Sequence, residues 1–237
     1  LIGEVDGEPV ATVSAVRYGH SFGFIGFYIV KPACRGRGYG LRIWQAAQAR
    51  LAGRLAGLDG VLAQEANYRR TGFILAYQNT RHQGTGGGPA PADPDIMPAA
   101  ALPWADLRAY DRPFFPDDRE RFLHAWLNQP GHTALAIRRR GALAGYGVLR
   151  PCRTGHKIGP LFADDSELAE RLFLALKARA PAGDAVFLDT PAANPAAAAL
   201  AQRHGLTAVF ATVRMYTGAP PPLPLDRIFG VTSFELG

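Results

Sequence analysis

The chain carries one order of predicted elements twice, once on each side of a segment rich in glycine and proline, residues 84–95. Each copy begins with a hairpin and continues with an apolar strand, a helix, a second strand, a short helix that ends at a glycine, and a last strand. The interval from Gly7 to Gly72 is 65 residues, and the interval from Gly141 to Gly205 is 64. The repeat predicts two α/β domains, and a coincidence between two ordinary α/β domains is the alternative.

The segment 84–95 holds four glycines and three prolines, a composition that does not sustain a regular element. We therefore predict an N-terminal domain over residues 1–83, a linker over 84–95 and a C-terminal domain over 96–237. The chain opens inside a strand-like run, and its first copy has no counterpart of residues 96–132. We expect the first domain to lack its opening strand and helices.

Hydrophobic periodicity gives the expected elements, with Asp6-Gly7 as the signal of the first hairpin turn. In the first copy we expect strands over residues 1–5, 9–18, 22–30 and 60–63, and a helix over 41–55. In the second copy we expect strands over 133–137, 142–149, 157–162 and 185–189, and helices over 117–127 and 167–178.

Composition excludes several classes of protein. With 48% apolar and 19% charged residues among 237, the chain is not disordered. No apolar run reaches the roughly 18 residues of a membrane span, and no signal peptide is visible. Two cysteines, Cys34 and Cys152, exclude a disulfide scaffold and favour a cytoplasmic location. The six histidines lack ligand spacing, so no metal is expected.

The net charge of +6 comes from 23 arginines and 3 lysines set against 20 acidic residues. The only basic run, Arg138 to Arg140, lies beside Gly141 in a predicted hairpin turn. Nucleic-acid binding calls for bases clustered in runs or stripes, so we do not expect it. We interpret the net positive charge instead as one that attracts an anionic cofactor.

The stretch from Phe27 to Gly40 runs from an apolar strand through a glycine-rich loop into an amphipathic helix. Its glycines let successive backbone N–H groups turn toward one point beside the positive end of the helix dipole, and Arg35 and Arg37 add charge. The loop therefore suits a diphosphate. No Lys-Ser or Lys-Thr follows, and Gly-x-Gly-x-Gly departs from the Rossmann spacing. A glycine-rich turn without a ligand is the alternative.

With Val30-Lys31-Pro32 before it, this loop resembles the signature of the GCN5-related N-acetyltransferases (GNAT), Arg/Gln-x-x-Gly-x-Gly/Ala between a strand and a helix. The resemblance implies acetyl-CoA as co-substrate, with its pyrophosphate on the loop amides and its pantetheine paired with the strand before the loop. The implied cofactor-binding residues are Tyr28, Ile29, Val30, Arg35, Gly36, Arg37, Gly38, Tyr39, Gly40 and Asn67. For Asn67, capping of the short helix is an equal alternative.

The second family mark is Tyr68, which with Gly72-Phe73 matches the GNAT pattern Tyr-x-x-x-Gly-Phe. In many relatives this tyrosine protonates the departing thiolate. A phenol with a pKa of about 10 can do so when it is held within hydrogen-bond distance. Packing under the sheet is the alternative role for Tyr68.

A general base would help if the acceptor amine is charged at neutral pH. Glu65 lies three residues before Tyr68, on the same side of a short helix. We predict that Glu65 is a catalytic residue and acts as this base. His20, before the CoA-binding strand, is another candidate, and for both a surface or turn role is the alternative. A covalent route through Cys34 is not expected, because the family transfers directly.

The second copy resembles the same fold without its chemistry. Where the loop should be, Gly159 to Ser166 lacks the glycine triplet and carries two aspartates that would repel a diphosphate. Ala201 stands at the position of Tyr68. We expect that this copy has lost CoA binding, and acyl-CoA binding by both copies is the alternative. Residues 145–150, 157–163 and 229–237 resemble the two-domain YitH-like GNAT subgroup.

We therefore predict an α/β protein of tandem GNAT-like domains, each a mixed, mostly antiparallel sheet flanked by helices. The predicted function is direct transfer of an acetyl group from acetyl-CoA to an amine, either a small molecule or a peptide. A non-catalytic acyl-CoA-binding sensor or assembly protein is the alternative. Two clusters either line an acceptor pocket or form a core with a basic rim: residues 110–116 with Arg119 and Trp126, and Arg150, Arg153, His156 and Lys157. No membrane partner is expected, and the oligomeric state is left open, a dimer included.

Overall fold

A computed structural model describes residues 1–237 as two compact units. Unit 1 comprises Leu1–Ala76, Val213–Pro221 and Phe234–Gly237, and unit 2 comprises Tyr77–Thr212 and Pro222–Ser233. Neither unit is continuous in sequence, whereas the predicted domains 1–83 and 96–237 are. The compact units and the predicted domains therefore divide the chain differently.

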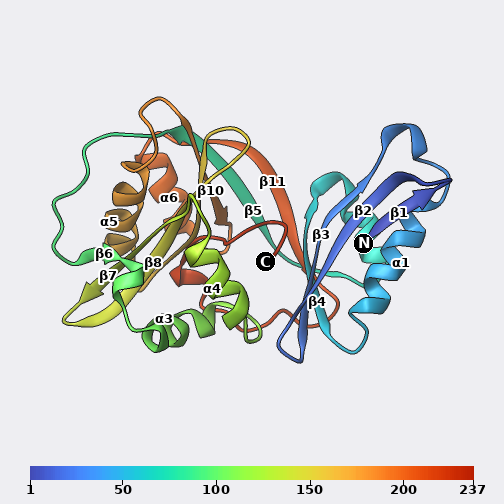
Figure 1. Cartoon of the computed structure of the whole chain (residues 1–237), viewed down its shortest axis with the longest axis horizontal. Helices are drawn as coiled ribbons and strands as arrows, with labels where there is room; N and C mark the ends of the chain where they lie inside the picture. The colour runs from blue at the N-terminus through green and yellow to red at the C-terminus, as the bar shows by residue number, and fades with distance from the viewer. The chain divides into compact units, whose positions relative to one another are not determined.

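Unit 1 is a sheet covered on one face by a helix (Figure 1). Its strands are β1 (Ile2–Val5), β2 (Glu8–Tyr18), β3 (Phe22–Val30) and β4 (Leu55–Val61), followed by the end of β11 (Thr207–Tyr216). The first three strands pair antiparallel, and β3 and β4 pair parallel. Helix α1 (Tyr39–Arg50) connects β3 to β4, as a parallel pair requires, and the short α2 (Glu65–Arg70) follows β4.

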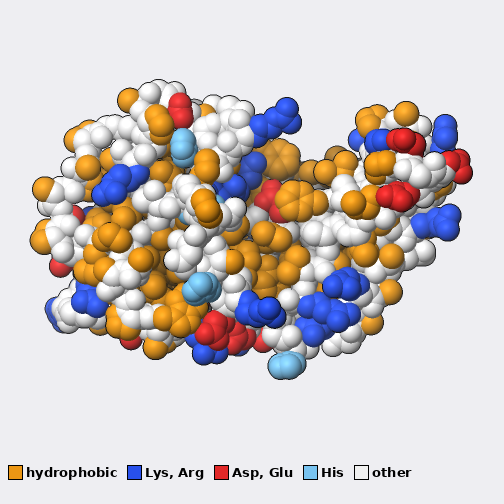
Figure 2. All heavy atoms as spheres, viewed as in Figure 1, with side chains coloured by type: hydrophobic (Ala, Val, Ile, Leu, Met, Phe, Trp, Pro, Cys, Tyr) orange, Lys and Arg blue, Asp and Glu red, His pale blue; other side chains and the backbone are white.

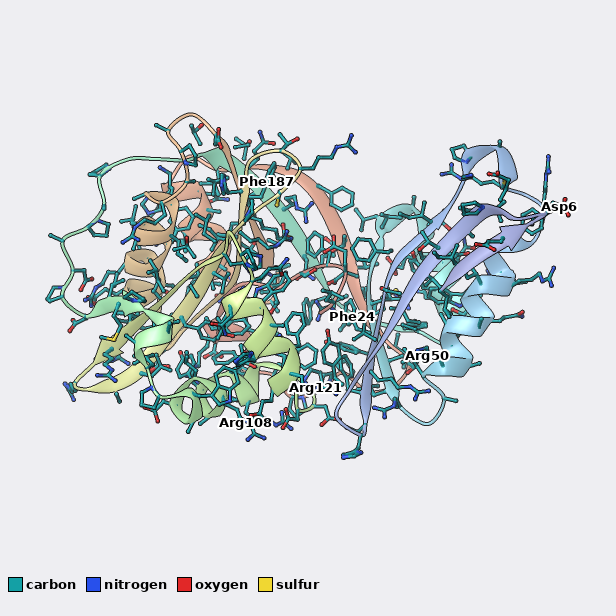
Figure 3. The ribbon with its side chains drawn as sticks, viewed as in Figure 1. Asp6, Phe24, Arg50, Arg108, Arg121 and Phe187 are labelled. Carbon is teal, nitrogen blue, oxygen red and sulfur yellow. The ribbon has the colours of Figure 1, made fainter.

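The β1–β2 hairpin forms as its turn residues dictate. Asp6 (φ 53°) and Gly7 (φ 80°) both adopt left-handed backbone conformations, which a two-residue hairpin turn needs. Asp6 lies at the tip of this hairpin (Figure 3). Behind the hairpin, alternate strand residues meet the apolar face of α1, so Ile25, Trp44 and Leu58 share one core.

Unit 2 has a mixed, mostly antiparallel sheet with helices on both faces. Its strand order is β5 (Ile74–Thr85), β10 (Ala185–Pro191), β9 (His156–Ala163), β8 (Ala142–Pro151), β7 (Thr133–Arg139) and β6 (Ile96–Pro98), and β12 (Ile228–Gly230) pairs with β9. Helices α5 (Ser166–Lys177) and α6 (Pro195–Arg203) form the main core with one face. Helices α3 (Trp104–Asp111) and α4 (Glu120–Asn128) cover the other face, where Phe114 stacks on Phe162.

At the surface of α3, opposite charges lie together near Arg108 (Figures 2 and 3). Arg108 pairs with Asp118 at 2.8 Å and with Glu120 at 3.1 Å. None of the helices combines the length and the hydropathy that crossing a bilayer requires.

Two expected elements were placed wrongly. The helix predicted over 41–55 ends at Arg50, and the strand predicted over 60–63 runs from Leu55 to Val61. Leu51 and Leu55 fit the helical spacing, but Gly53 (φ 76°) turns the chain back between them. The first residues of the predicted linker are also regular, because Gly84 and Thr85 belong to β5 and pair with β10.

Candidate functional site

The candidate site of unit 1 is the opening between β3 and β4. These strands pair only over Phe22–Ile25 and Leu55–Leu58, although β3 continues to Val30 and β4 to Val61. A bulge lies where they part, between the β2 pairing of Gly26 and that of Ile29. Within it Phe27 has a φ of 50°, an uncommon value for a residue with a side chain. Residues 28–30 therefore leave their backbone unpaired toward β4.

The glycine-rich loop lies at the wide end of this β3–β4 opening. Arg35 Nε donates to the Val30 carbonyl at 3.2 Å, which ties the loop to the end of β3. Gly36 (φ 74°) and Gly38 (φ 81°) are left-handed, and Gly38 is the N-cap of α1 without a side-chain cap. The first turn of α1 holds no acidic residue. Exposed amides at an uncapped helix N-terminus suit an anion such as a diphosphate.

Gly40 lets α1 approach β3 closely. A Cβ at this position would lie 2.7 Å from Tyr28 Oη and 3.1 Å from Val30 Cγ2. A side chain would therefore push the start of α1 away from the strand that borders the opening.

Aromatic rings line the α1 face of the opening. Tyr28 of β3 lies 5.1 Å from Trp44 of α1, and Trp44 lies 5.5 Å from Tyr68 of α2, between ring centroids. The Tyr68 ring lies against Gly60 of β4, where a Cβ would overlap it. Tyr28, Trp44 and Tyr68, hereafter the aromatic row, thus extend from one diverging strand to the other.

The environment keeps Tyr68 protonated. Burial raises the pKa of its phenol, and a negative charge on Tyr28 would raise it further. Burial also raises the pKa of Tyr28. At neutral pH both hydroxyl groups therefore carry their protons, so Tyr68 can donate one to an anion that forms in the opening.

Trp44 is the buried centre of the aromatic row. It is 3% exposed, and its Nε1 atom is buried without a hydrogen-bond acceptor. An unsatisfied buried donor costs about 1–3 kcal/mol. A core chosen for stability alone would be expected to avoid it.

The other face of the same strands holds an ion pair that sequence reasoning missed. Asp59 of β4 accepts from Arg214 of β11 at 2.8 and 2.6 Å, and the Arg214 guanidinium lies 5.1 Å from the Phe24 ring. Phe24 lies on the face of β3 away from α1 (Figure 3). The only signal would have been a lone acid and a lone base in two apolar strands, 155 residues apart.

The C-terminal segment also lies against the point where β3 leaves β4. A Cβ at Gly26 would overlap the backbone of Glu235, and the Tyr18 hydroxyl donates to the Leu236 carbonyl at 2.8 Å. Gly26 therefore makes room for chain from the far end of the sequence.

The other predicted site residues lie outside the aromatic row. Glu65 is in the first turn of α2 and accepts from Arg69 Nε at 2.8 Å. Asn67 is exposed and is bonded to Gln64 and Arg70, so it does not cap a helix. Ile29 is 54% exposed beside the opening.

Two weaker candidates have ordinary surroundings. His20 lies in the turn before β3, at the end of that strand away from the opening. Cys34 is half-buried at the edge of the core. No group of three or more His, Cys, Asp or Glu side chains is placed to hold a metal ion.

In unit 2, the corresponding opening is filled by the chain itself. Strands β9 and β10 pair in parallel over His156–Ile158 and Val186–Leu188 and then part. Strand β12 pairs with β9 beyond that point, and Val231 N donates to the Asp189 carbonyl of β10 at 2.9 Å. A Cβ at Gly159 would lie 2.6 Å from the Val231 carbonyl oxygen. The Asp165 side chain caps α5 by accepting from Leu168 N at 3.0 Å.

Comparison with known proteins identifies the family. An Acetyltransferase (GNAT) family model matches residues 1–76, and an Acetyltransferase (GNAT) domain model matches residues 107–230. This chain belongs to the GNAT superfamily. The predicted α/β fold with tandem GNAT domains is thereby confirmed.

The GNAT chain has a similar curated relative and similar solved structures. It is 30% identical over 236 residues to holothin acyltransferase of Pseudoalteromonas sp. (strain SANK 73390), covering 100% of this chain and 80% of the relative. A putative acetyltransferase from Pyrococcus horikoshii has a TM-score of 0.82 at 23% identity, with 98% and 78% of the two chains covered. A tandem GNAT protein from the clavulanic acid biosynthesis pathway has a TM-score of 0.58 at 16% identity, with 92% and 82% covered. The prediction of an acyltransferase enzyme is confirmed by the family and by the holothin acyltransferase relative.

Proposed function

We propose that unit 1 of this GNAT acyltransferase binds acetyl-CoA and transfers the acetyl group directly to an amine. The observation that carries the proposal is the β3–β4 opening, which has an uncapped helix N-terminus at its wide end and Tyr68 on its wall. An anion site, a free strand edge and a proton donor would then border one opening.

Binding would use backbone groups more than side chains. The amides of residues 36–40 and the dipole of α1 would hold the diphosphate, with Arg35 and Arg37 as exposed positive charges beside it. The unpaired backbone of Tyr28–Val30 would pair with the amides of the pantetheine, as an added strand does at a sheet edge.

Acetyl transfer would take place at the bulge. The amine nitrogen forms a bond to the thioester carbonyl carbon, the C–S bond breaks, and the nitrogen loses a proton. Backbone N–H groups at residues 27–29 would stabilise the oxygen as it becomes negative. Tyr68 would donate its proton to the departing thiolate, and positioning along β3 would supply much of the remaining rate.

The general base is a separate proposal. Glu65 would accept the amine proton through water, and this role requires its ion pair with Arg69 to open. Replacing Glu65 by Gln keeps the size and removes the base. A drop in kcat that disappears at high pH, where the amine is already neutral, would support the role.

The experiment that tests the function measures CoA release and acetyl-CoA binding together. The full chain is incubated with acetyl-CoA and a panel of primary amines, and free thiol is followed while calorimetry gives the Kd. Holothin belongs in the panel because the curated relative is named for it, and peptide N-termini represent the other acceptor class. Turnover with one amine class supports the proposal. Tight binding of acetyl-CoA without turnover on any amine would instead favour a non-catalytic acyl-CoA sensor.

A further inference from the structure

The aromatic row closes the α1 face of the β3–β4 opening. Tyr28, Trp44 and Tyr68 follow one another at centroid distances of 5.1 and 5.5 Å, which are those of rings in contact. The row reaches from β3 to Gly60 of β4 and so borders the opening on its α1 side. A ligand in the opening therefore ends against aromatic rings on that side.

Trp44 occupies the middle of the row, where an acyl group would lie. A pantetheine paired with Tyr28–Val30 would run from the loop toward Ile25 and Leu58, the last residues at which β3 and β4 pair. The acyl group would then reach the narrow end of the opening beside Trp44, which is 3% exposed. A longer chain could advance only by displacing this ring or separating paired strands.

The unsatisfied indole N–H of Trp44 indicates that the large size of this side chain is what matters at position 44. Phe or Leu would fill a core without leaving a buried donor unpaired, yet Trp44 Nε1 has no acceptor. The Phe73 ring lies 5.8 Å from Trp44 between centroids, is 2% exposed and belongs to the same core as Trp44.

Resting on the proposed function of unit 1, we infer that Trp44 sets the length of the acyl group. Its ring admits an acetyl group and excludes long straight chains such as hexanoyl. Trp44 is thus a specificity-determining residue, and the group it selects is a short acyl thioester of CoA.

The test compares acetyl-, propionyl-, butyryl- and hexanoyl-CoA on the full chain and three variants. Trp44→Leu and Trp44→Ala shorten the row, and Phe73→Leu is a smaller truncation of another buried ring, outside the row. For each, calorimetry gives the Kd of every thioester, and CoA release with a reactive amine gives kcat/KM. Circular dichroism and Tm identify a variant that does not fold, and Trp44→Leu is the milder of the two.

Wild type is expected to favour acetyl-CoA over hexanoyl-CoA by at least about tenfold. Trp44→Leu and Trp44→Ala should each reduce that ratio by about tenfold, while Phe73→Leu leaves it within about twofold. A ratio unchanged in a folded Trp44 variant, or a wild type that prefers hexanoyl-CoA, would overturn the inference.

Failure of the proposed function would look different. If no amine is acylated by wild type but the four thioesters bind, acyl transfer in unit 1 is refuted. The Kd ratios still test Trp44, because a size limit acts on the bound thioester whether or not it reacts.

Discussion

The two units contain the same strand divergence and use it in opposite ways. In unit 1, β3 and β4 part after Ile25 and Leu58 and leave an edge of backbone unpaired. In unit 2, β9 and β10 part after Ile158 and Leu188, and β12 fills the space. A strand edge that is paired within its own chain is not available to a ligand. The comparison teaches that an added strand can fill in one unit the opening that the other unit leaves free.

The N-termini of α1 and α5 also differ in a way that favours an anion in unit 1 and disfavours one in unit 2. Gly38 leaves the start of α1 uncapped, whereas Asp165 caps α5 with a carboxylate at the corresponding place. A carboxylate there satisfies the helix and repels a phosphate at once. Both differences support one acyl-CoA per chain, bound in unit 1.

The largest expected effect tests what holds the filled opening of unit 2. Arg119 and Asp111 are both nearly inaccessible and are bonded to each other, and Arg119 also donates to Thr232 of the filling segment at 3.1 Å. Arg119→Met leaves the Asp111 carboxylate buried beside the Tyr146 hydroxyl, and we expect a loss of about 3–5 kcal/mol. Denaturant unfolding and amide exchange of β12 measure it. A loss below about 1 kcal/mol would contradict this account.

The second prediction concerns the proton donor that we propose for unit 1. Tyr68→Phe should lower kcat by about 10²–10⁴-fold and leave the Kd of acetyl-CoA unchanged. The protonated phenol is the active form and burial raises its pKa, so its contribution persists at neutral pH and is lost only as pH rises through that raised value. Rate–pH profiles of wild type and variant should therefore converge at high pH. Equal kcat for both proteins at pH 7 would exclude Tyr68 as the acid.

A third change would make unit 1 resemble unit 2 at its helix terminus. Gly38→Asp places a carboxylate at the start of α1, and we expect the Kd of acetyl-CoA to rise by about a hundredfold because like charges repel. Gly38→Asn is the matched control, since Asn and Asp both tolerate a φ near 81° and differ in charge. The two Kd values are compared by calorimetry. Similar values for the two variants would show that charge at this terminus does not govern binding.

The smallest expected effect comes from the exposed arginine of the loop. Arg35→Ala should raise the Kd of acetyl-CoA by about three- to tenfold, because an exposed charge contributes little and is screened by salt. Arg50→Ala, at the opposite end of α1 (Figure 3), should leave the Kd unchanged. The difference between wild type and Arg35→Ala should shrink at high salt. If the difference in Kd does not depend on salt, the Arg35 side chain contributes to binding by packing and not by its charge.

Local signals predicted much of unit 1. The strand Phe22–Val30 matches its predicted bounds, because Gly19 marks the turn that precedes the strand and can be recognised in the sequence. The helix start and the glycine loop followed from the same signals. The helix end did not, because Leu55 continues the helical spacing and only tertiary pairing assigns it to β4.

Long-range features were out of reach of such reasoning. Nothing near Ile228 shows that this short apolar segment enters the sheet beside β9. Likewise, the partnership of Asp59 with Arg214 depends on a strand that arrives from the second half of the chain. Trp44 falls inside the helix predicted over 41–55, and its place between two tyrosines emerged only from packing.

The exchange of strands between the sequence halves has a consequence for biosynthesis. Unit 1 receives Val213–Pro221 from beyond nearly all of unit 2, and β4 must wait for the partner that carries Arg214. A ribosome therefore releases Leu1–Ala76 long before the sheet of this segment can be completed. We expect a nascent chain arrested at residue 100 to remain protease-sensitive in its N-terminal part, and the released chain, with Val213–Pro221 and Phe234–Gly237 in place, to be resistant there.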